Sequence, residues 1–214
     1  MNTNYVLSTT PNMPAAIDSN LIDEAMSHGF SFSVTPSLGC VSPRKNLAAG
    51  ITSTLVTGSK GRSANLGDQR MITSHTYSCV ADAIDAYAAA NNLPREDMMC
   101  YTVYKREMGD IQLSIEPFGL EVGGSIAGFI FESRAKLRAE FNVQRISPRL
   151  TRTIEDRLQR EMTELATWAN GQVFDVSLID DEGDIVESLE SVYGLGHNIN
   201  NAATELLVMC ADLA

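Results

Sequence analysis

The chain has 214 residues, of which 44% are hydrophobic and 20% are charged, and this composition excludes wholesale disorder. No apolar run approaches the roughly 18 residues that a membrane-spanning helix needs, so we expect no membrane partner. The formal net charge is −11, which is unlike the basic balance of most nucleic-acid-binding proteins.

The four cysteines are widely spaced in the sequence, at Cys40, Cys79, Cys100 and Cys210. They form no Cys-x-x-Cys pair, so the spacing predicts neither a zinc site nor a disulfide-dense scaffold. The first ten residues lack the basic start and the long apolar stretch of a secretory signal. We therefore expect reduced thiols in a cytoplasm and no metal or cofactor.

The first half of the chain alternates short apolar segments with polar loops. The elements expected there are a strand at 5–7, a helix from Asp18 or Ser19 to Gly29, a strand at 30–34, a loop at 35–50, a strand at 51–57, a polar loop at 58–67 and a helix from Ser78 to about 92. Gly29 and the Asn91–Asn92 pair are typical ends for the two helices.

The second half is dominated by hairpins. We expect strands at 98–106 and 111–116, at 126–132 and 137–144, and at 173–179 and 185–189, with helices at 147–170 and from 198 or 200 onward. The helix at 147–170 has the clearest pattern, because Ser147 can cap it, Pro148 suits its first position and apolar residues follow at spacings of three and four.

Short turns, not crossover helices, join these strands. The sequence therefore predicts an α+β fold, with a mainly antiparallel sheet built from β-hairpins and about four helices packed on it. We expect an N-terminal α/β region at 1–97 and a C-terminal region of hairpin–helix units at 98–214, or one continuous domain.

One pair of residues could support catalysis. His75 lies four residues before Cys79, which is expected at a helix start, where the pKa of a thiol falls. A buried structural cysteine is the commoner explanation of such a residue. An enzyme is therefore not favoured, although a small enzyme of nucleic-acid or nucleotide metabolism stays an alternative.

Basic residues are concentrated between 134 and 160. Arg149, Arg152, Arg157 and Arg160 lie off the apolar stripe of the expected helix and could contact phosphate or an acidic partner. Acidic residues alternate with them at helical spacings, which favours a solvated, salt-bridged face. Direct binding of nucleic acid is thus less favoured than binding of protein.

Acidic residues dominate the last fifth of the chain, because residues 171–214 hold nine acids and no Lys or Arg. An Asp-Glu-Gly turn places several of them at the exposed tip of a hairpin. The clustered acids repel one another. Their clustering is explained either by a basic partner or by an acidic strand edge that resists aggregation. The candidate partner-binding residues are Asp180, Asp181, Glu182, Asp184, Glu187 and Glu190.

The segment from Val176 to Leu189, with Tyr193-Gly194 and a helix rich in Ala and Leu, resembles a hairpin–Tyr-Gly–helix module of small accessory proteins of bacteriophages and plasmids. Val192 stands where that module usually has an aromatic residue, and the resemblance covers about 40 residues. It implies a mobile-element protein in the cytoplasm of a bacterial host. Several anti-defence proteins of that kind are acidic and occupy nucleic-acid-binding surfaces.

These observations together predict a non-enzymatic acidic protein that binds and inhibits a host defence or nucleic-acid-binding protein, as a nucleic-acid mimic, through a basic surface of that host protein. A second alternative, besides the enzyme, is a self-assembling structural protein. In that case the basic stretch of one copy meets the acidic segment of the next, and the chain forms a homo-oligomer.

Overall fold

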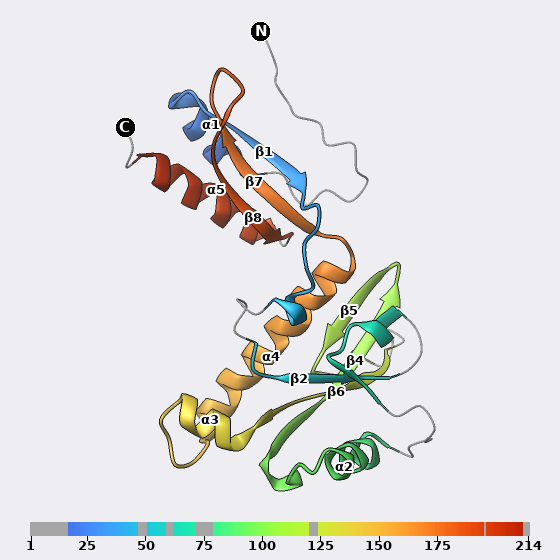
Figure 1. Ribbon diagram of the computed structural model, residues 1–214. Helices are drawn as coiled ribbons and strands as arrows, with labels where there is room; N and C mark the ends of the chain where they lie inside the picture. The colour runs from blue at the N-terminus through green and yellow to red at the C-terminus, as the bar shows by residue number, and fades with distance from the viewer. Residues whose placement is uncertain are drawn as a thin grey trace. The chain divides into compact units, whose positions relative to one another are not determined.

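The structure is a computed structural model that describes residues 17–46, 51–58, 62–71, 79–119, 124–194 and 196–211 (Figure 1). The chain divides into two compact units. Residues 1–41 and 170–214 form the first, called the N/C unit below, and residues 42–169 form the second, called the central unit.

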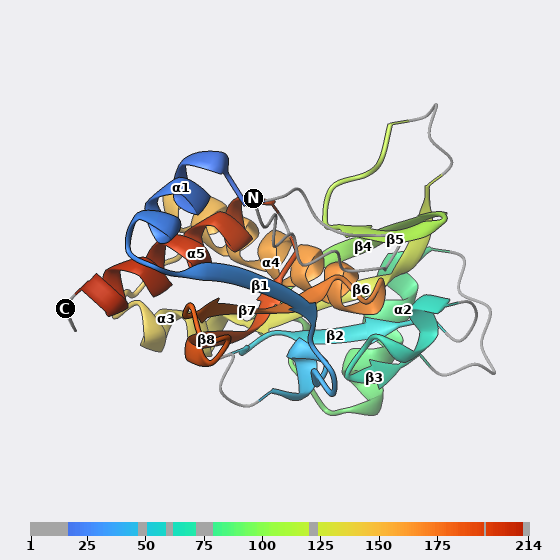
Figure 2. The same ribbon diagram turned by 90° about the horizontal axis from the view of Figure 1, so that it is seen from above.

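The N/C unit is a small antiparallel sheet with two helices on one face. Its elements are α1 (Ser19–Ser27), β1 (Ser31–Pro36), β7 (Val173–Ile179), β8 (Ile185–Tyr193) and α5 (Gly196–Ala211). The strand order is β1-β7-β8, so a strand from the start of the chain pairs with the C-terminal hairpin. In Figures 1 and 2, α1 and α5 lie side by side against this sheet.

Alternation along the strands separates the two faces of this sheet. On the face toward the helices, Val176 and Leu178 of β7 pack with Ile199 and Leu206 of α5, and all four are fully or almost fully buried. On the opposite face, Ser33, Ser177 and Ser188 stand in register across the three strands. The buried face supplies the hydrophobic core of the unit.

The central unit is built on a five-stranded sheet of order β3-β2-β6-β4-β5, in which β2 and β3 are parallel and the other pairs antiparallel. Its elements are the 3₁₀ turns η1 (Pro43–Lys45), η3 (Arg62–Asn65) and η4 (Arg95–Asp97), the strands β2 (Thr54–Thr57), β3 (Gln69–Arg70), β4 (Met98–Met108), β5 (Asp110–Ser114) and β6 (Ser125–Ser133), and the helices α2 (Val80–Ala90), α3 (Arg134–Glu140) and α4 (Pro148–Ala169).

Helices cover both faces of this sheet. Leu55 and Ile130 belong to the core that includes Leu158 of α4, whereas their neighbours Val56 and Phe129 belong to the core that includes residues of α2. Adjacent residues of one strand point to opposite faces, so α4 and α2 pack on opposite sides of the sheet (Figure 1).

These observations confirm the α+β fold with mostly antiparallel strands. The expected helix at 147–170 is present as α4, and its apolar stripe is buried. The hairpins β4–β5 and β7–β8 and the final helix are also present. The described residues contain five α-helices, one more than expected.

The additional helix is α3, which replaces the strand expected at 137–144. That expectation was wrong because the alternation of apolar residues is compatible both with a strand and with a short helix. Ser133 caps the helix, since its Oγ accepts a hydrogen bond from the backbone N–H of Lys136 at 3.2 Å. Asn142 ends it in the left-handed region at a φ of 50°. The hairpin between 126 and 144 is therefore a strand followed by a short helix.

The expected boundary near residue 97 falls inside the central unit. β2, from the first half of the chain, pairs with β6, from the second half, so one sheet contains segments from both sides of that boundary. The strand expected at 5–7 lies outside the described residues. Among the residues that the structure describes, no helix is long and apolar enough to cross a membrane.

Candidate functional site

The charges of the chain separate according to its folding units. The central unit contains all 16 Lys and Arg residues, with 15 of the 27 acids. The N/C unit contains no Lys or Arg and the remaining 12 acids, which are Asp18, Asp23, Glu24, Asp175, Asp180, Asp181, Glu182, Asp184, Glu187, Glu190, Glu205 and Asp212. No carboxylate of this unit can therefore pair with a Lys or Arg of the same unit.

The tip of the β7–β8 hairpin is held by one of these acids. Oδ1 of Asp180 accepts hydrogen bonds from the backbone N–H groups of Glu182, at 3.0 Å, and Asp184, at 2.9 Å. Gly183 has a φ of 91°, a conformation that other residues rarely adopt. Asp180 thus has a structural role, and the turn holds the neighbouring acids in fixed positions.

The six candidate binding residues do not share one environment. Asp181, Glu182, Asp184 and Glu190 are exposed, whereas Asp180 and Glu187 are half-buried. Glu187 is paired with Leu178, which packs against α5, and its charge adds to the burial that raises the pKa of the Cys210 thiol. Four of the six carboxylates are thus free to meet a partner, three of them at the tip.

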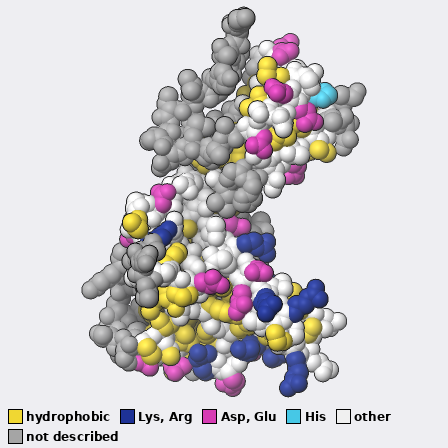
Figure 3. Space-filling model, turned by 180° about the vertical axis from the view of Figure 1, so that it is seen from behind, with side chains coloured by type: hydrophobic (Ala, Val, Ile, Leu, Met, Phe, Trp, Pro, Cys, Tyr) yellow, Lys and Arg dark blue, Asp and Glu magenta, His cyan; other side chains and the backbone are white. Residues whose placement is uncertain are grey.

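Two aliphatic residues are exposed next to these acids. Ile185 is 66% exposed and Val186 is 38% exposed, and both directly follow Asp184 in the chain. Figure 3 shows hydrophobic and acidic side chains next to one another on the visible face of the N/C unit. The hairpin therefore offers apolar contact area beside its charges.

The Tyr-Gly pair after β8 has a clear structural reason. The backbone N–H of Gly194 bonds to the carbonyl of Gln172 at 2.8 Å, and a Cβ at this position would lie 2.6 Å from the ring of Phe174. Only glycine fits there. The side chain of Asn198 bonds to the carbonyl of Tyr193 at 3.2 Å, which fixes the start of α5 on the hairpin.

The contacts of the α4 arginines differ from the expected ones, in which arginines and acids at helical spacings form a salt-bridged face. Arg157 is partly buried, and its guanidinium bonds to Glu132 and Glu140, both at 2.6 Å. Two of the helical acids interact with groups outside α4, since Glu161 binds Arg44 and the charge of Glu155 adds to the burial that raises the pKa of Tyr101. Arg149 and Arg152 are exposed and form no ion pair within the described part of the chain. Arg160 is also exposed.

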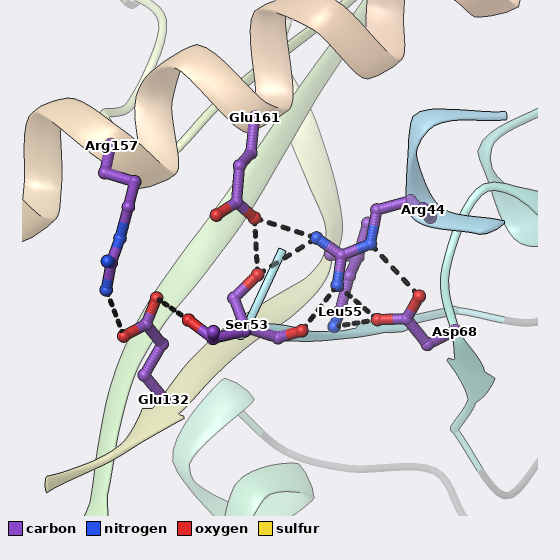
Figure 4. A network of polar contacts seen from close by, with 8 residues as sticks. Arg44, Ser53, Leu55, Asp68, Glu132, Arg157 and Glu161 are labelled. Atoms are coloured by element: carbon purple, nitrogen blue, oxygen red, sulfur yellow. Dashed lines mark hydrogen bonds and ion pairs between the residues drawn. The ribbon is translucent and has the colours of Figure 1, made fainter. Parts of the chain in front are cut away.

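A buried polar network that the sequence did not reveal lies under α4 (Figure 4). The Arg44 side chain is only 3% exposed and bonds through Nη1 to Glu161 Oε2 at 2.9 Å and through Nε to Asp68 at 3.0 Å. Nη2 of Arg44 donates to the carbonyl of Ser53 at 2.8 Å, and the Ser53 hydroxyl donates to Glu161. Asp68 accepts the N–H of Leu55 at 2.7 Å. The network joins η1, β2 and α4.

Glu132 forms the second part of this network, next to the groups that bind Glu161. It is 3% exposed, contacts Thr52 and binds Arg157. Burial raises the pKa of Glu132 above its usual range, and the positive charge of Arg157 only partly opposes this effect. Every hydroxyl and carboxylate of the two parts contacts another protein group, and among the described side chains only Nε of Arg157 is buried without a hydrogen-bond partner. The arrangement therefore suits stability better than catalysis.

The proposed catalytic pair is only half described. Cys79 is exposed at the N-cap position of α2 and makes no side-chain capping hydrogen bond. His75 lies outside the described residues, so the geometry of the pair stays a prediction. Within the described ranges, no group of three or more His, Cys, Asp or Glu side chains could hold a metal ion.

No family model matches the chain, and neither a curated protein nor a solved structure is similar to it in the comparisons made. The function is therefore inferred from the charges, the exposed residues and the fold of this chain alone.

Proposed function

We propose that the protein is a non-enzymatic binding protein whose acidic N/C unit docks on a basic, nucleic-acid-binding surface of a host protein. The observation that carries this proposal is the charge of the N/C unit, which has 12 acids and no Lys or Arg. Its negative charges cannot be neutralised by Lys or Arg within the unit. A partner that supplies positive charge would relieve their mutual repulsion.

The rigid hairpin tip supports a docking role. Because Asp180 and Gly183 fix the turn, Asp181, Glu182 and Asp184 are presented without further ordering of the backbone. A preorganised surface loses less entropy on binding than a flexible acidic tail. Acids held in this way can take the place of phosphates in a basic groove and release the counterions of that groove.

The exposed aliphatic residues favour docking over a purely solubilising role. A surface that only prevents aggregation would place polar side chains beside its acids. Instead, Ile185 and Val186 follow the tip. Apolar contacts surrounded by charge are typical of protein–protein interfaces, in which a few residues supply most of the affinity.

The biological setting of the proposal comes from the resemblance of the hairpin–Tyr-Gly–helix segment to modules of bacteriophage and plasmid accessory proteins. On that basis we place the protein in the cytoplasm of a bacterial host and its partner among host defence or nucleic-acid-binding proteins. Inhibition would follow from occupation of the surface where the partner binds nucleic acid.

Capture experiments with immobilised chain and bacterial lysate test the proposal. The variant Asp181→Asn, Glu182→Gln, Asp184→Asn should capture at least tenfold less of the same proteins at low salt. The control Glu96→Gln, Asp110→Asn, Glu116→Gln makes the same charge change on the central unit and should capture as much as the wild type. Equal capture by all three chains would contradict the proposal.

A second variant separates the apolar contribution from the charge. Ile185→Ser removes an exposed aliphatic group and leaves every carboxylate in place. It should weaken capture at low and high salt by the same factor, because apolar contact is not screened. The triple charge variant should instead lose capture mainly at low salt.

A further inference from the structure

A cluster of basic side chains lies on α3, on the first half of α4 and on the loop between them. Between Arg134 and Arg152 the chain has six basic residues and one acid, Glu140. Glu140 is bound to Arg157 and is therefore occupied. Figure 3 shows Lys and Arg side chains gathered over these elements. The basic cluster is defined here as Lys136, Arg145, Arg149 and Arg152.

All four side chains of the basic cluster are exposed. None of them forms a hydrogen bond or an ion pair through its side chain in the described residues. Arg149 and Arg152 are three residues apart on α4, so they lie on the same side of the helix. Within the described part of the central unit, the cluster is thus a positive surface whose side chains bind no acid.

Charge complementarity identifies the occupant of this surface. Nucleic acid fits poorly, because the same chain has a net charge of −11 and would repel a polyanion. The N/C unit of a second copy fits well, since it has 12 acids, no Lys or Arg and a rigid acidic tip. Each copy therefore contributes one surface of each sign.

We propose that the basic cluster of one copy docks on the acidic hairpin tip of another copy, so that the protein associates head to tail. The two surfaces are different, so the contact is heterologous and each copy can bind two neighbours. The inference rests on the proposed function for the hairpin, because host protein and second copy would compete for the same tip. Self-association would thus occupy the binding surface until a partner displaces it.

Sedimentation velocity with two neutralised variants tests this arrangement. The first, Arg145→Gln, Arg149→Gln, Arg152→Gln, keeps the acidic tip, and the second, Asp181→Asn, Glu182→Gln, Asp184→Asn, keeps the basic cluster. At about 50 mM salt the wild type should form species whose mass grows with concentration, and at about 500 mM it should be monomeric. Each variant alone should be monomeric, and an equal mixture should contain pairs of two chains and nothing larger.

A control variant, Arg70→Gln, Arg95→Gln, Arg106→Gln, removes the same charge elsewhere on the central unit and should associate like the wild type. A wild type that stays monomeric at all concentrations would overturn the proposal, as would association of either variant alone. Binding of duplex DNA to the cluster of a monomeric wild type would assign the surface to nucleic acid instead. The arginine variant also separates the two proposals, since it should still capture host protein through its intact tip.

Discussion

Arg44 and Glu161 are 117 residues apart in the sequence, yet Nη1 of the arginine lies 2.9 Å from Oε2 of the glutamate. Both side chains are almost fully buried, at 3% and 8% exposure. The arginine also binds Asp68 and the hydroxyl and carbonyl groups of Ser53. This pair fixes the segment that enters the central unit to α4, the longest helix.

Removal of either Arg44 or Glu161 alone should therefore destabilise the fold. Arg44→Met leaves the Glu161 carboxylate buried without its positive charge, and the free energy of unfolding should fall by about 3–5 kcal/mol. Urea unfolding measures this change. The double variant Arg44→Met, Glu161→Met removes both charges and should recover part of the loss. A double variant as unstable as the sum of the two single variants would contradict a coupled pair.

The acids of the hairpin tip should differ in their effect on stability. Asp180→Ala removes the acceptor of two backbone hydrogen bonds and should lower the free energy of unfolding by about 1–2 kcal/mol. The triple variant at Asp181, Glu182 and Asp184 removes repulsion and should have an equal or higher Tm. Thermal melting of both variants makes the comparison. A lower Tm for the triple variant would show that these acids stabilise the fold.

The raised pKa of Glu132 predicts that the free energy of unfolding depends on pH. Burial raises the pKa of Glu132 in the folded protein, so the folded state binds the proton more tightly than the unfolded state. The stability that protonated Glu132 provides is present at low pH and is lost as the pH rises through the raised pKa. Relative to the Glu132→Gln variant, the wild type should thus lose free energy of unfolding as the pH rises above about 4.5.

Urea unfolding of the two chains between about pH 4.5 and pH 7.5 measures this difference. Glu140→Gln serves as the control, because it removes the more exposed carboxylate that binds the same arginine. A wild type that gains stability relative to Glu132→Gln as the pH rises would mean that Arg157 outweighs the cost of burial.

Cys79 gives a prediction about the alternative enzyme. Serine is a better N-cap than cysteine, so Cys79→Ser should raise the free energy of unfolding by roughly 0.5–1 kcal/mol through a new hydrogen bond to α2. Capture of host proteins should change by less than about threefold. A hundredfold loss would revive a role for the thiol with His75 and would argue against a purely non-enzymatic protein.

The sequence predicts those elements whose signals are local. Ser147, Pro148 and a regular apolar stripe define α4, and the Asp-Glu-Gly turn defines the β7–β8 hairpin. α3 was missed because seven residues contain less than two full periods of a helix, so the alternation from Leu137 to Val143 favoured a strand. The cap at Ser133 is the local signal that could have corrected it.

Contacts between distant segments could not be predicted. The pairing of β1 with β7 brings Asp23 and Glu24 of α1 into the same unit as the C-terminal acids, so the charge separation is sharper in the fold than along the sequence. Helical spacing favoured pairing between acids and arginines of α4, whereas Glu161 binds Arg44. Such long-range pairs leave no periodic signal in one sequence.

The most direct test of the central claim is displacement by nucleic acid. Host proteins captured by the immobilised chain are washed with duplex DNA at constant low salt, and the released fraction is measured. If the acidic N/C unit occupies a nucleic-acid-binding surface, DNA should release most of the captured protein. The same should hold for the chain with Arg145→Gln, Arg149→Gln and Arg152→Gln, which excludes DNA that acts through the basic cluster. Capture that resists DNA in both chains would contradict the account.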